Sequence, residues 1–434
     1  MPGTDHAGLA TQGKIDALMT EQGLDPSGME FYDFAESYKQ TLGGEINQQL
    51  RRTGASCDWT RYTFTLDNNY GRAVTHALRI CHEQGMLHER DGQWYLDMSK
   101  LAEDLNRDIT NGEITIIPES GANTLRHGFL DAIEPWCISR QIRWGHKLPI
   151  WRGTDGLITI SDEAIPGATR EEGCLDTWFS SALWPFATLG WPEDTEDLRR
   201  FYPAAMIETA DDIIFFWCAR MLMMGQLLTG QRPFKTIFLH GLIRDDQGRK
   251  FSKSLDNGID PLEIIDKYGC DAMRFALAEQ TRPGIDMPLR DEYFINARNI
   301  RTKLWNASKF TLSHLRRMGP PSDSRKQASD LKLMSLLQEA MENTSGYLEH
   351  LNYAAAALEA RRALYDIFCG WYLEEIKSRL YEENDPEALA TLLEGLKMCL
   401  QMLHPFMPFV TEHIWGQFND VGLITSKWKI AEKE

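Results

Sequence analysis

The sequence has little that points to a membrane, a secreted environment or a bound metal. It shows no secretory signal and no apolar run close to the ~20 residues that a membrane span requires. The eight cysteines include no C-x-x-C pair, which argues against a zinc knuckle and indicates reduced thiols in a cytosol. We therefore expect a cytoplasmic protein with no membrane contact, no structural zinc and no metal site.

Positive charge is scarce as well. The 434 residues include 46 Lys and Arg against 63 Asp and Glu, which gives a net charge of −17. This balance argues against a general nucleic-acid coat, but phosphate binding follows local charge, so a local basic patch remains compatible. The length and the 43% hydrophobic content predict two or three domains with a substantial core.

A Walker-type nucleotide site is also absent, because no G-x-x-x-x-G-K-[ST] occurs. A different loop stands out: Lys250–Ser254 reads KFSKS and follows the apolar run Ile237–Leu239 and His240-Gly241. Ligands in α/β folds bind at the carboxyl ends of parallel strands, and lysine ammonium groups there can neutralise a triphosphate. A solvated, charged connector is the alternative for such a loop.

Strands that alternate with helices predict an α/β domain with a parallel sheet in the first part of the chain. The expected elements are a helix at 70–86 that stops near Gly85, a hairpin at 87–98 that turns at Asp91-Gly92, a buried helix from Asp211 to Gly225, a strand at 236–239 and a helix at 260–268.

The last part of the chain has a different pattern. Pro320-Pro321 and small polar residues interrupt the sequence at 316–330, and beyond them leucine and alanine recur at helical spacing to about Phe418. An α-helical bundle is the natural prediction for this region.

The KFSKS loop resembles the KMSKS region of class I aminoacyl-tRNA synthetases, and more specifically that of the valyl-tRNA synthetase family. Other stretches are similar to blocks of the valyl enzymes in the same order. They include PGTDHAGLATQ and CLDTWFSSALWPFATLGWPE, and together they are Pro2–Gln12, Cys57–Arg61, Trp136–Trp151, Cys174–Glu193, Trp305–Phe310 and His404–Trp415.

The resemblance implies a Rossmann-like catalytic domain followed by an anticodon-binding bundle. It also implies ATP-dependent activation of valine and its transfer to tRNA(Val), with ATP and Mg²⁺ as the substrate complex and the protein a monomer. The domains expected are a catalytic domain at 1–290, a basic helical junction at 291–320, a helical anticodon-binding-like bundle at 321–418 and a tail at 419–434.

The resemblance assigns roles residue by residue. Trp178, Ile213 and Trp217 would line the amino-acid pocket, Asp5 would accept the α-ammonium group, and Asp212 would contact the amino acid or the ribose. From the residues alone, ordinary core aromatics and a helix N-cap at Asp5 are the alternatives. The ATP-binding residues would be His240, Gly241, Lys250, Ser252, Lys253 and Ser254, with Lys250 and Lys253 catalytic because they would stabilise the charge of departing pyrophosphate.

Two departures from the family pattern shape the expectation. The H-I-G-H motif, which the family carries upstream of the P-G-T-D-H-A-G block, does not occur, so we expect a fragment, a mis-started reading frame or a paralogue that lost the first βα unit. The chain alone should then activate valine poorly or not at all unless that segment is supplied elsewhere. The large editing domain of the valyl family is also missing, because Gly85 leads through the Asp91-Gly92 hairpin directly into the segment expected beyond it.

A basic stretch predicts the tRNA contact. Between Ala297 and Pro320 there is no acidic residue, and a solvated helix face is the alternative to phosphate binding. The six cations are Arg298, Arg301, Lys303, Lys309, Arg316 and Arg317. The sequence thus favours an editing-free valyl-tRNA synthetase-like enzyme, with a non-catalytic remnant that binds tRNA or an amino acid, or a paralogue with another acceptor, as the alternatives.

Overall fold

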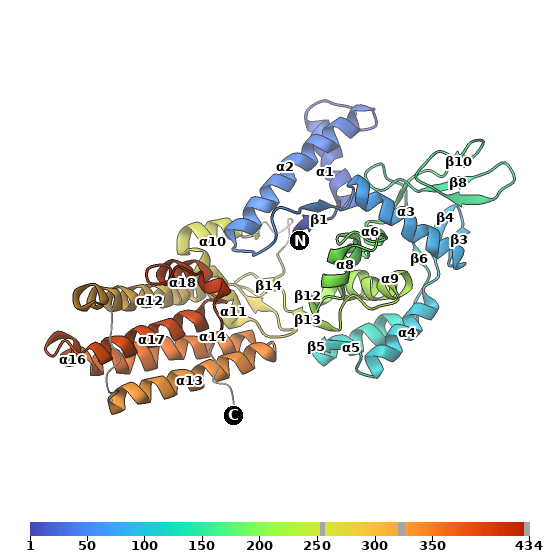
Figure 1. Ribbon diagram of the computed structural model, residues 1–434. Helices are drawn as coiled ribbons and strands as arrows, with labels where there is room; N and C mark the ends of the chain where they lie inside the picture. Colours follow the sequence, from blue (N-terminus) through green and yellow to red (C-terminus); the bar gives the residue numbers. More distant parts are fainter. Residues whose placement is uncertain (252–256, 320–325, 429–434) are drawn as a thin grey trace. The chain divides into compact units, whose positions relative to one another are not determined.

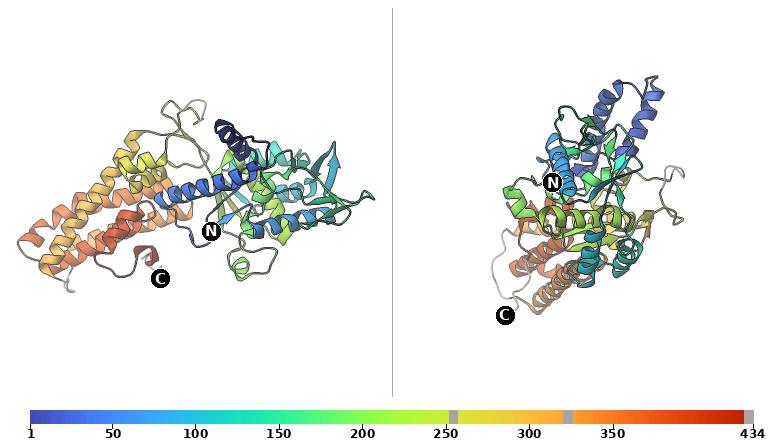
Figure 2. Two further views of the ribbon diagram at one scale, coloured as in Figure 1. Left: turned by 90° about the horizontal axis from the view of Figure 1, so that it is seen from above. Right: turned by 90° about the vertical axis from the view of Figure 1, so that its right-hand side faces the viewer.

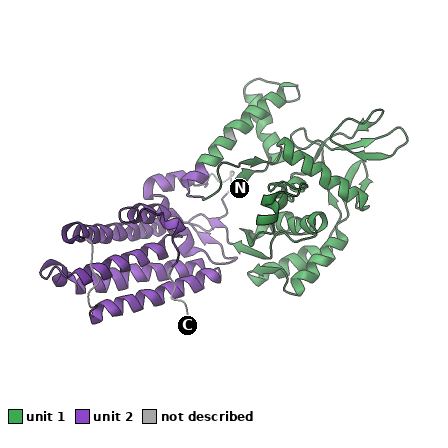
Figure 3. Ribbon diagram, in the orientation of Figure 1, with its two compact units in different colours: residues 1–48, 56–240 green, residues 49–55, 241–434 purple. Residues whose placement is uncertain are grey.

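The computed structural model describes residues 1–251, 257–319 and 326–428, which divide into two compact units (Figures 1 and 3). Unit 1 comprises residues 1–48 and 56–240, and unit 2 comprises residues 49–55 and 241–434. Helix α2 (Glu30–Arg52) contributes residues to both.

Parallel strands form the framework of unit 1. The strands β12 (Met206–Ala210), β13 (Thr236–His240) and β5 (Thr115–Ile117) form a parallel sheet in that order, and β1 (Gly3–Thr4) and β2 (Thr63–Phe64) form a second parallel pair. Ile237, Phe238 and Leu239 of β13 are all buried, as expected of a strand covered on both faces. The predicted α/β class and the strand at 236–239 are confirmed.

A hairpin in unit 1 matches the sequence prediction closely. The strands β3 (Leu87–Arg90) and β4 (Gln93–Leu96) pair antiparallel, and β6 (Trp136–Cys137) extends the sheet. Asp91 and Gly92 have φ angles of 52° and 72°, the left-handed pair that a two-residue type I′ turn requires. The remaining strands of the unit are β7 (Ser139–Arg140), β8 (Ile150–Arg152), β9 (Ile158–Ile160), β10 (Thr169–Arg170) and β11 (Cys174–Leu175).

Helices surround these strands. Helix α3 (Asn68–Glu83) confirms the predicted helix, and Gly85 follows it with a φ of 71°, the left-handed conformation common after a helix end. The other helices of unit 1 are α1 (Gly8–Glu21), α4 (Ser99–Thr110), α5 (Glu119–Leu125), η1 (Arg126–Leu130), α6 (Thr177–Ser181), α7 (Trp184–Ala187) and α8 (Glu196–Phe201).

The predicted helix from Asp211 to Gly225 is wrong in its end and in its form. The run begins as a 3₁₀ turn, η2 (Asp211–Ile213), widens into a π-helix, η3 (Ile214–Ala219), and continues as α9 (Arg220–Thr229) to Gly230. Gly225 lies inside α9, where a Cβ would come within 2.7 Å of Pro233 Cδ. The glycine is therefore needed for close packing and does not end the helix.

The same run corrects the expectation of no long apolar segment. Residues Asp211–Thr229 are long and apolar enough to cross a membrane by length and composition, and half of the apolar window is buried inside the protein. Met221, Leu222, Met223 and Met224 belong to the core cluster of unit 1, which is typical of a core helix.

Unit 2 is helical apart from the short parallel strands β14 (Ile243–Arg244) and β15 (Met287–Pro288). Its long helices lie side by side in both views of Figure 2 and share one core. The helices of the described part of unit 2, long and short, are α10 (Pro261–Tyr268), α11 (Cys270–Gln280), α12 (Asp291–Met318), α13 (Ala328–Glu349), α14 (Tyr353–Arg362), η4 (Ala363–Tyr372), α15 (Leu373–Glu375), α16 (Lys377–Tyr381), α17 (Pro386–Leu403), α18 (Pro408–Trp415) and η5 (Leu423–Thr425).

These elements confirm the predicted helix at 260–268 and the helical bundle. The Asp260 side chain accepts a hydrogen bond from the backbone N–H of Leu262, so α10 has an N-cap of the expected kind. Helix α12 ends at Met318 and α13 begins at Ala328, on either side of the predicted break.

Candidate functional site

The turn between β1 and α1 presents Asp5. Its Oδ1 accepts a hydrogen bond from the backbone N–H of Ala7 at 3.0 Å, and its Oδ2 accepts one from the Ser181 hydroxyl at 3.2 Å. Ala7, with φ 43°, is the residue that precedes α1. Asp5 is therefore not the N-cap of this helix, and its carboxylate instead spans from the turn to α6.

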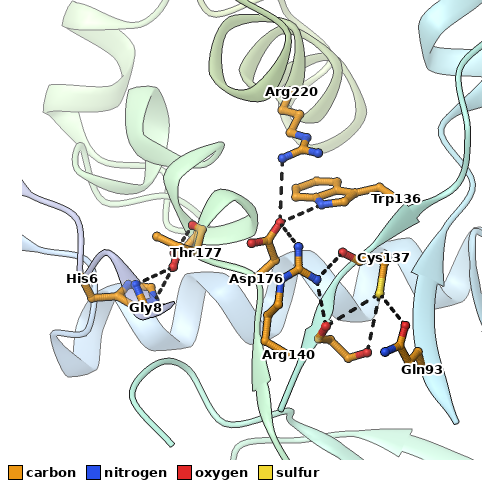
Figure 4. Close-up of polar contacts among 11 residues, drawn as sticks. His6, Gly8, Gln93, Trp136, Cys137, Arg140, Asp176, Thr177 and Arg220 are labelled. Atoms are coloured by element: carbon orange, nitrogen blue, oxygen red, sulfur yellow. Dashed lines mark hydrogen bonds and ion pairs between the residues drawn. The ribbon is translucent and has the colours of Figure 1, made fainter. Parts of the chain in front are cut away.

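A buried histidine that the sequence reasoning did not single out holds this turn. His6 Nδ1 is hydrogen bonded to Thr65 Oγ1 at 2.8 Å, and the same oxygen accepts the backbone N–H of His6 at 3.0 Å. Thr177 Oγ1 lies 3.4 Å from His6 Nε2 and accepts the N–H of Gly8 at 2.8 Å (Figure 4). The position of His6 next to Asp5 in the G-T-D-H-A-G block was the available signal.

The environment of His6 keeps its ring neutral. Burial, with a smaller contribution from His146, lowers the pKa of His6 to about 3. The two rings meet edge to face with centroids 5.3 Å apart. A charge on His6 would be unfavourable because the ring is buried and lies beside the titratable ring of His146. The turn is therefore held by hydrogen bonds between neutral groups.

Of the predicted amino-acid residues, Trp217 comes next to Asp5 through Ser181, and none of Trp178, Ile213 and Trp217 lines the pocket beside Asp5. Trp217 Nε1 donates a hydrogen bond to the backbone oxygen of Ser181 at 3.2 Å, and Ser181 is also the residue that contacts Asp5. The Trp178 ring stacks on Phe216 with centroids 6.2 Å apart.

Trp178, Trp217 and Ile213 are partly exposed, so they are not fully enclosed core residues. Ile213 and the exposed Asp212 lie in η2, directly before η3. Ile213 ends a 3₁₀ turn and Trp217 lies in a π-helix, so their spacing of four residues does not put them on one α-helical face.

A pocket of about 600 Å³ opens beside Asp5. Its wall includes Tyr38 and Lys39 of α2, and Phe64 of β2. The Lys39 ammonium lies 4.7 Å from the centre of the Phe64 ring and 3.2 Å from Glu36. The sequence reasoning missed this wall, because α2 carries no recognisable motif and joins the pocket through the fold.

The end of β13 places His240 and Gly241. His240 Nε2 lies 3.4 Å from Glu208 Oε1 on β12. At Gly241 a Cβ would lie 1.8 Å from the backbone oxygen of Ile285, so the backbone itself demands glycine there. Backbone packing against Ile285 is therefore enough to explain the glycine, without a bound nucleotide.

The stretch before KFSKS is a hairpin anchored by Asp245. Its Oδ1 accepts the backbone N–H of Arg249 at 2.7 Å, and its Oδ2 accepts the Asn257 side-chain amide at 3.0 Å. The Asn257 hydrogen bond and those from Arg249 lower the pKa of Asp245 to about 2.

The two predicted catalytic lysines differ in what the structure describes of them. Lys250 forms a β-bridge with Arg244 across the hairpin, and its backbone oxygen accepts a hydrogen bond from Asn257 at 3.3 Å. The other loop residues of the prediction, Ser252, Lys253 and Ser254, lie outside the described residues.

The basic stretch forms the long helix α12 of unit 2, but its six cations do not share one face. Helical spacing places Arg298, Lys309 and Arg316 on the face that also carries the exposed Trp305. The Trp305 ring stacks on His413 with centroids 5.6 Å apart.

The other cations of α12 lie on other faces of the helix, and Lys303 and Arg317 are exposed as well. The Lys303 ammonium lies 5.9 Å from the centre of the Tyr365 ring, and Arg317 Nη2 donates to the backbone oxygen of Leu380 at 2.5 Å. Arg301 lies against Gly269, where a Cβ would meet its guanidinium.

Among the described residues, no group of three or more His, Cys, Asp or Glu side chains is placed to hold a metal ion. All eight cysteines are free.

The chain and its fold have counterparts in known proteins. The chain matches the family described as tRNA synthetases class I (I, L, M and V) over residues 1–92, 90–165 and 158–290, and the anticodon-binding domain of tRNA ligase over residues 330–434. The protein belongs to the class I tRNA synthetase family.

Within that family the similar curated proteins are valine–tRNA ligases. The chain is 44% identical over 364 residues to that of Symbiobacterium thermophilum, covering 78% of this chain and 39% of the relative. It is 40% identical over 373 residues to that of Thermotoga maritima, covering 83% of this chain and 43% of the relative. The predicted resemblance to the valyl enzymes is confirmed, and the chain spans about two fifths of the length of these relatives.

Solved structures agree on the fold. The agnB2 LeuRS of Agrobacterium radiobacter K84, solved as a ternary complex with tRNA and LeuAMS, aligns with a TM-score of 0.78 at 16% identity, over 99% of this chain and 81% of that chain. Methionyl-tRNA synthetase of Mycobacterium tuberculosis, bound by methionyl-adenylate, aligns with a TM-score of 0.71 at 19% identity, over 95% and 84% of the two chains.

Proposed function

We propose that the protein activates valine with ATP and transfers it to tRNA(Val), without an editing step. The observation that supports this most directly is the meeting of Asp5, Ser181 and Trp217 in unit 1. These residues come from sequence blocks similar to those of valyl enzymes, far apart in the chain, and they combine a carboxylate with rigid aromatic walls.

The reaction assigns a role to each group. The Asp5 carboxylate holds the α-ammonium group of valine, while Trp178, Ile213 and Trp217 enclose its branched side chain and Asp212 contacts the amino acid or the ribose. A valine carboxylate oxygen attacks the α-phosphate of Mg²⁺-bound ATP, and pyrophosphate leaves. A terminal ribose hydroxyl of tRNA then attacks the acyl carbon, and AMP leaves.

The charge that develops on pyrophosphate needs cations. Lys250 and Lys253 supply them, with Ser252 and Ser254 as hydrogen-bond donors and His240 and Gly241 beside the nucleotide. The Asp245 anchor supports this arrangement, because it fixes the hairpin at Arg249 and Asn257 on both sides of the KFSKS loop.

Transfer to tRNA requires a surface for its phosphates. The face of α12 that carries Arg298, Lys309 and Arg316 supports this role, because its exposed Trp305 adds a flat ring on which a base can stack. Lys303 and Arg317 are engaged with Tyr365 and Leu380 and contribute less.

The lack of editing is inferred from the β3–β4 hairpin. Arg90 and Gln93 pair directly across a two-residue turn, at the place where the valyl family carries its editing domain. A chain that closes in two residues leaves no room for an inserted module at this point.

Valine-dependent ATP–pyrophosphate exchange tests the proposed activity. Asp5→Asn keeps the size of the side chain but removes its charge, so it should raise the valine concentration needed for half-maximal exchange by about tenfold or more, the scale of one hydrogen bond to a charged group. The matched control is Asp25→Asn, an exposed aspartate outside this pocket.

The exchange assay also separates the alternatives. A non-catalytic remnant would bind valine or tRNA without any exchange, and a paralogue with another acceptor would exchange normally but leave tRNA(Val) uncharged. An Asp5→Asn protein with unchanged valine dependence would remove Asp5 from the site.

A further inference from the structure

A second cavity in unit 1, of about 340 Å³, lies apart from the pocket beside Asp5. Its size falls in the range of small-molecule sites, about 300 to 1,000 Å³. It lies between the segment from η1 to β6 and the helical run of η3 and α9. Its apolar wall consists of Met98, Phe129, Ile133, Trp136, Phe215 and Met223.

One buried cation lines this apolar cavity. The Arg220 side chain is 9% exposed, and its guanidinium lies 4.0 Å from the centre of the Trp136 ring. Its Nη1 is buried and has no hydrogen-bond partner among the described residues, and the Asp176 carboxylate lies 3.8 Å away. A buried polar atom without a hydrogen bond calls for a physical explanation.

Asp176 does not satisfy Arg220 because other donors occupy it. Its Oδ2 accepts the Trp136 indole N–H at 2.9 Å and lies 3.1 Å from Arg140 Nη2 (Figure 4). Two guanidinium groups thus share one carboxylate, which leaves one positive charge unbalanced at the wall of the cavity. Although burial lowers the pKa of Arg220 to about 10, the side chain stays protonated at neutral pH.

Arg140 also lines the cavity, and the wall has one acidic residue, Glu134, which is exposed. It offers no hydrogen bond to the buried Nη1, and its negative charge opposes the entry of an anion. A ligand that carries two or more negative charges would exceed the single unbalanced charge of the arginines, whereas a neutral ligand would leave that charge unbalanced. The site therefore suits one negative charge on an apolar body.

We propose that this cavity binds an apolar monocarboxylate, with the carboxylate on Arg220 and the apolar body against Phe129 and Phe215. The two phenyl rings stack with centroids 4.6 Å apart and form a flat wall, which suits an aromatic or branched body. A carboxylate fits the planar, two-pronged geometry of a guanidinium group. Binding here requires none of the residues assigned to valine, ATP or tRNA.

Isothermal titration calorimetry with 3-phenylpropanoate tests the proposal, with 3-phenylpropanamide, acetate and inorganic phosphate as comparison ligands. The carboxylate should bind about tenfold more tightly than its amide or more, because the hydrogen bond it makes is to a charged group. Acetate and phosphate should bind more weakly than 3-phenylpropanoate. Equal binding of the amide would contradict the role proposed for Arg220. Equal binding of acetate or phosphate would contradict the proposed contact of an apolar body with the wall. If 3-phenylpropanoate does not bind at all, the proposed site is wrong.

Variants locate the binding. Arg220→Met should abolish the preference for the carboxylate, whereas Arg199→Met, which changes an exposed arginine of the same unit, should not. Two further variants leave the buried arginine in place. Ala132→Trp should block the cavity, which Ala132 lines from an exposed position, and Glu134→Gln should strengthen carboxylate binding by removing a repulsive charge.

Thermal melts show which variants remain folded. If Arg220→Met does not fold, Ala132→Trp and Glu134→Gln still test the proposal. The proposal requires the first variant to weaken binding of 3-phenylpropanoate and the second to strengthen it. Tight binding that neither variant changes would place the ligand elsewhere and contradict the proposal.

Discussion

Two loops of the molecule carry predicted functional groups, and they are held by opposite kinds of interaction. The β1–α1 turn of unit 1 presents Asp5 and is fixed by neutral groups, chiefly His6, Thr65 and Thr177. The hairpin of unit 2 leads to the KFSKS loop and is fixed by Asp245, whose carboxylate bonds to Arg249 and Asn257. In both loops the residue that holds the shape differs from the residue that is proposed to do the chemistry.

The difference teaches how each loop responds to acid. Protonation of His6 would place a charge in a buried site, whereas the pKa of about 2 keeps Asp245 ionised far below neutral pH. The turn that carries Asp5 should therefore weaken first as the pH falls, and the hairpin should persist. This contrast rests on the two anchor residues and is open to direct test.

The largest expected effect is on the hairpin side. Lys253→Ala should reduce the rate of valine-dependent ATP–pyrophosphate exchange by on the order of 10²-fold or more, the scale of losing one preorganised electrostatic group at a developing charge. Lys250→Ala should act in the same direction. Lys326→Ala, an exposed lysine of the same unit, is the control, and an unchanged rate would remove the substituted lysine from the catalytic set.

The next largest effect is the loss of stability in acid that His6 should cause. Because the folded-state pKa of His6 lies below the ordinary value of 6.5, the unfolded state binds the proton more tightly. The free energy of unfolding is therefore fully retained above pH 6.5 and falls as the pH drops from 6.5 toward 3, by up to about 1.4 kcal/mol per pH unit. His146, with a pKa lowered from 6.5 to about 4 chiefly by burial, adds a similar slope between these two pH values.

Urea unfolding at pH 7, 6, 5 and 4 measures this slope. His6→Gln should make it shallower, while His350→Gln, at an exposed position in unit 2, is the control. A His6→Gln slope as steep as that of the wild-type protein would mean that the histidine titrates equally in both states, and the contrast between the two loops would fail.

The smallest effect concerns salt. If the α12 face meets tRNA phosphates, each of Arg298→Gln, Lys309→Gln and Arg316→Gln should reduce the log–log slope of tRNA affinity against salt by roughly 0.7 to 0.9. Lys303→Gln, on the opposite side of the same helix, should change it less. Equal slopes in all four variants would show that this face is only a solvated surface.

The sequence predicted the local features of the fold well and the tertiary ones poorly. The Asp91-Gly92 turn was predictable because a type I′ turn requires two successive residues with positive φ, and an Asp-Gly pair is among those that adopt this conformation most readily. The end of the helix at Gly225 was mispredicted because glycine there serves contact with Pro233, which no local pattern encodes. The π-helix at η3 is likewise invisible to a spacing of 3.6 residues.

In the candidate site, too, residues in recognisable motifs were predicted and residues that matter through tertiary contacts were not. Asp5, Trp178 and Trp217 were proposed from motif resemblance, and the structure brings Asp5 and Trp217 together through Ser181. Asp245 and Arg220 were not proposed, because a single charged residue in a turn or in an apolar helix has no distinctive sequence pattern. Their importance follows from their partners, which the fold alone supplies.

The central claim is that this protein is a valine-activating synthetase module without editing, and threonine tests it most directly. Threonine has the shape of valine with a hydroxyl in place of one methyl group, and discrimination of only about 10² at the synthetic site is the established figure for valyl-tRNA synthetases themselves, which we adopt. Supplied with the missing N-terminal segment, ATP and tRNA(Val), the protein should charge valine and also accumulate Thr-tRNA, without extra ATP consumption. Rapid hydrolysis of preformed Thr-tRNA(Val) by this protein would contradict the account, because it would require an editing site that the β3–β4 turn leaves no room for.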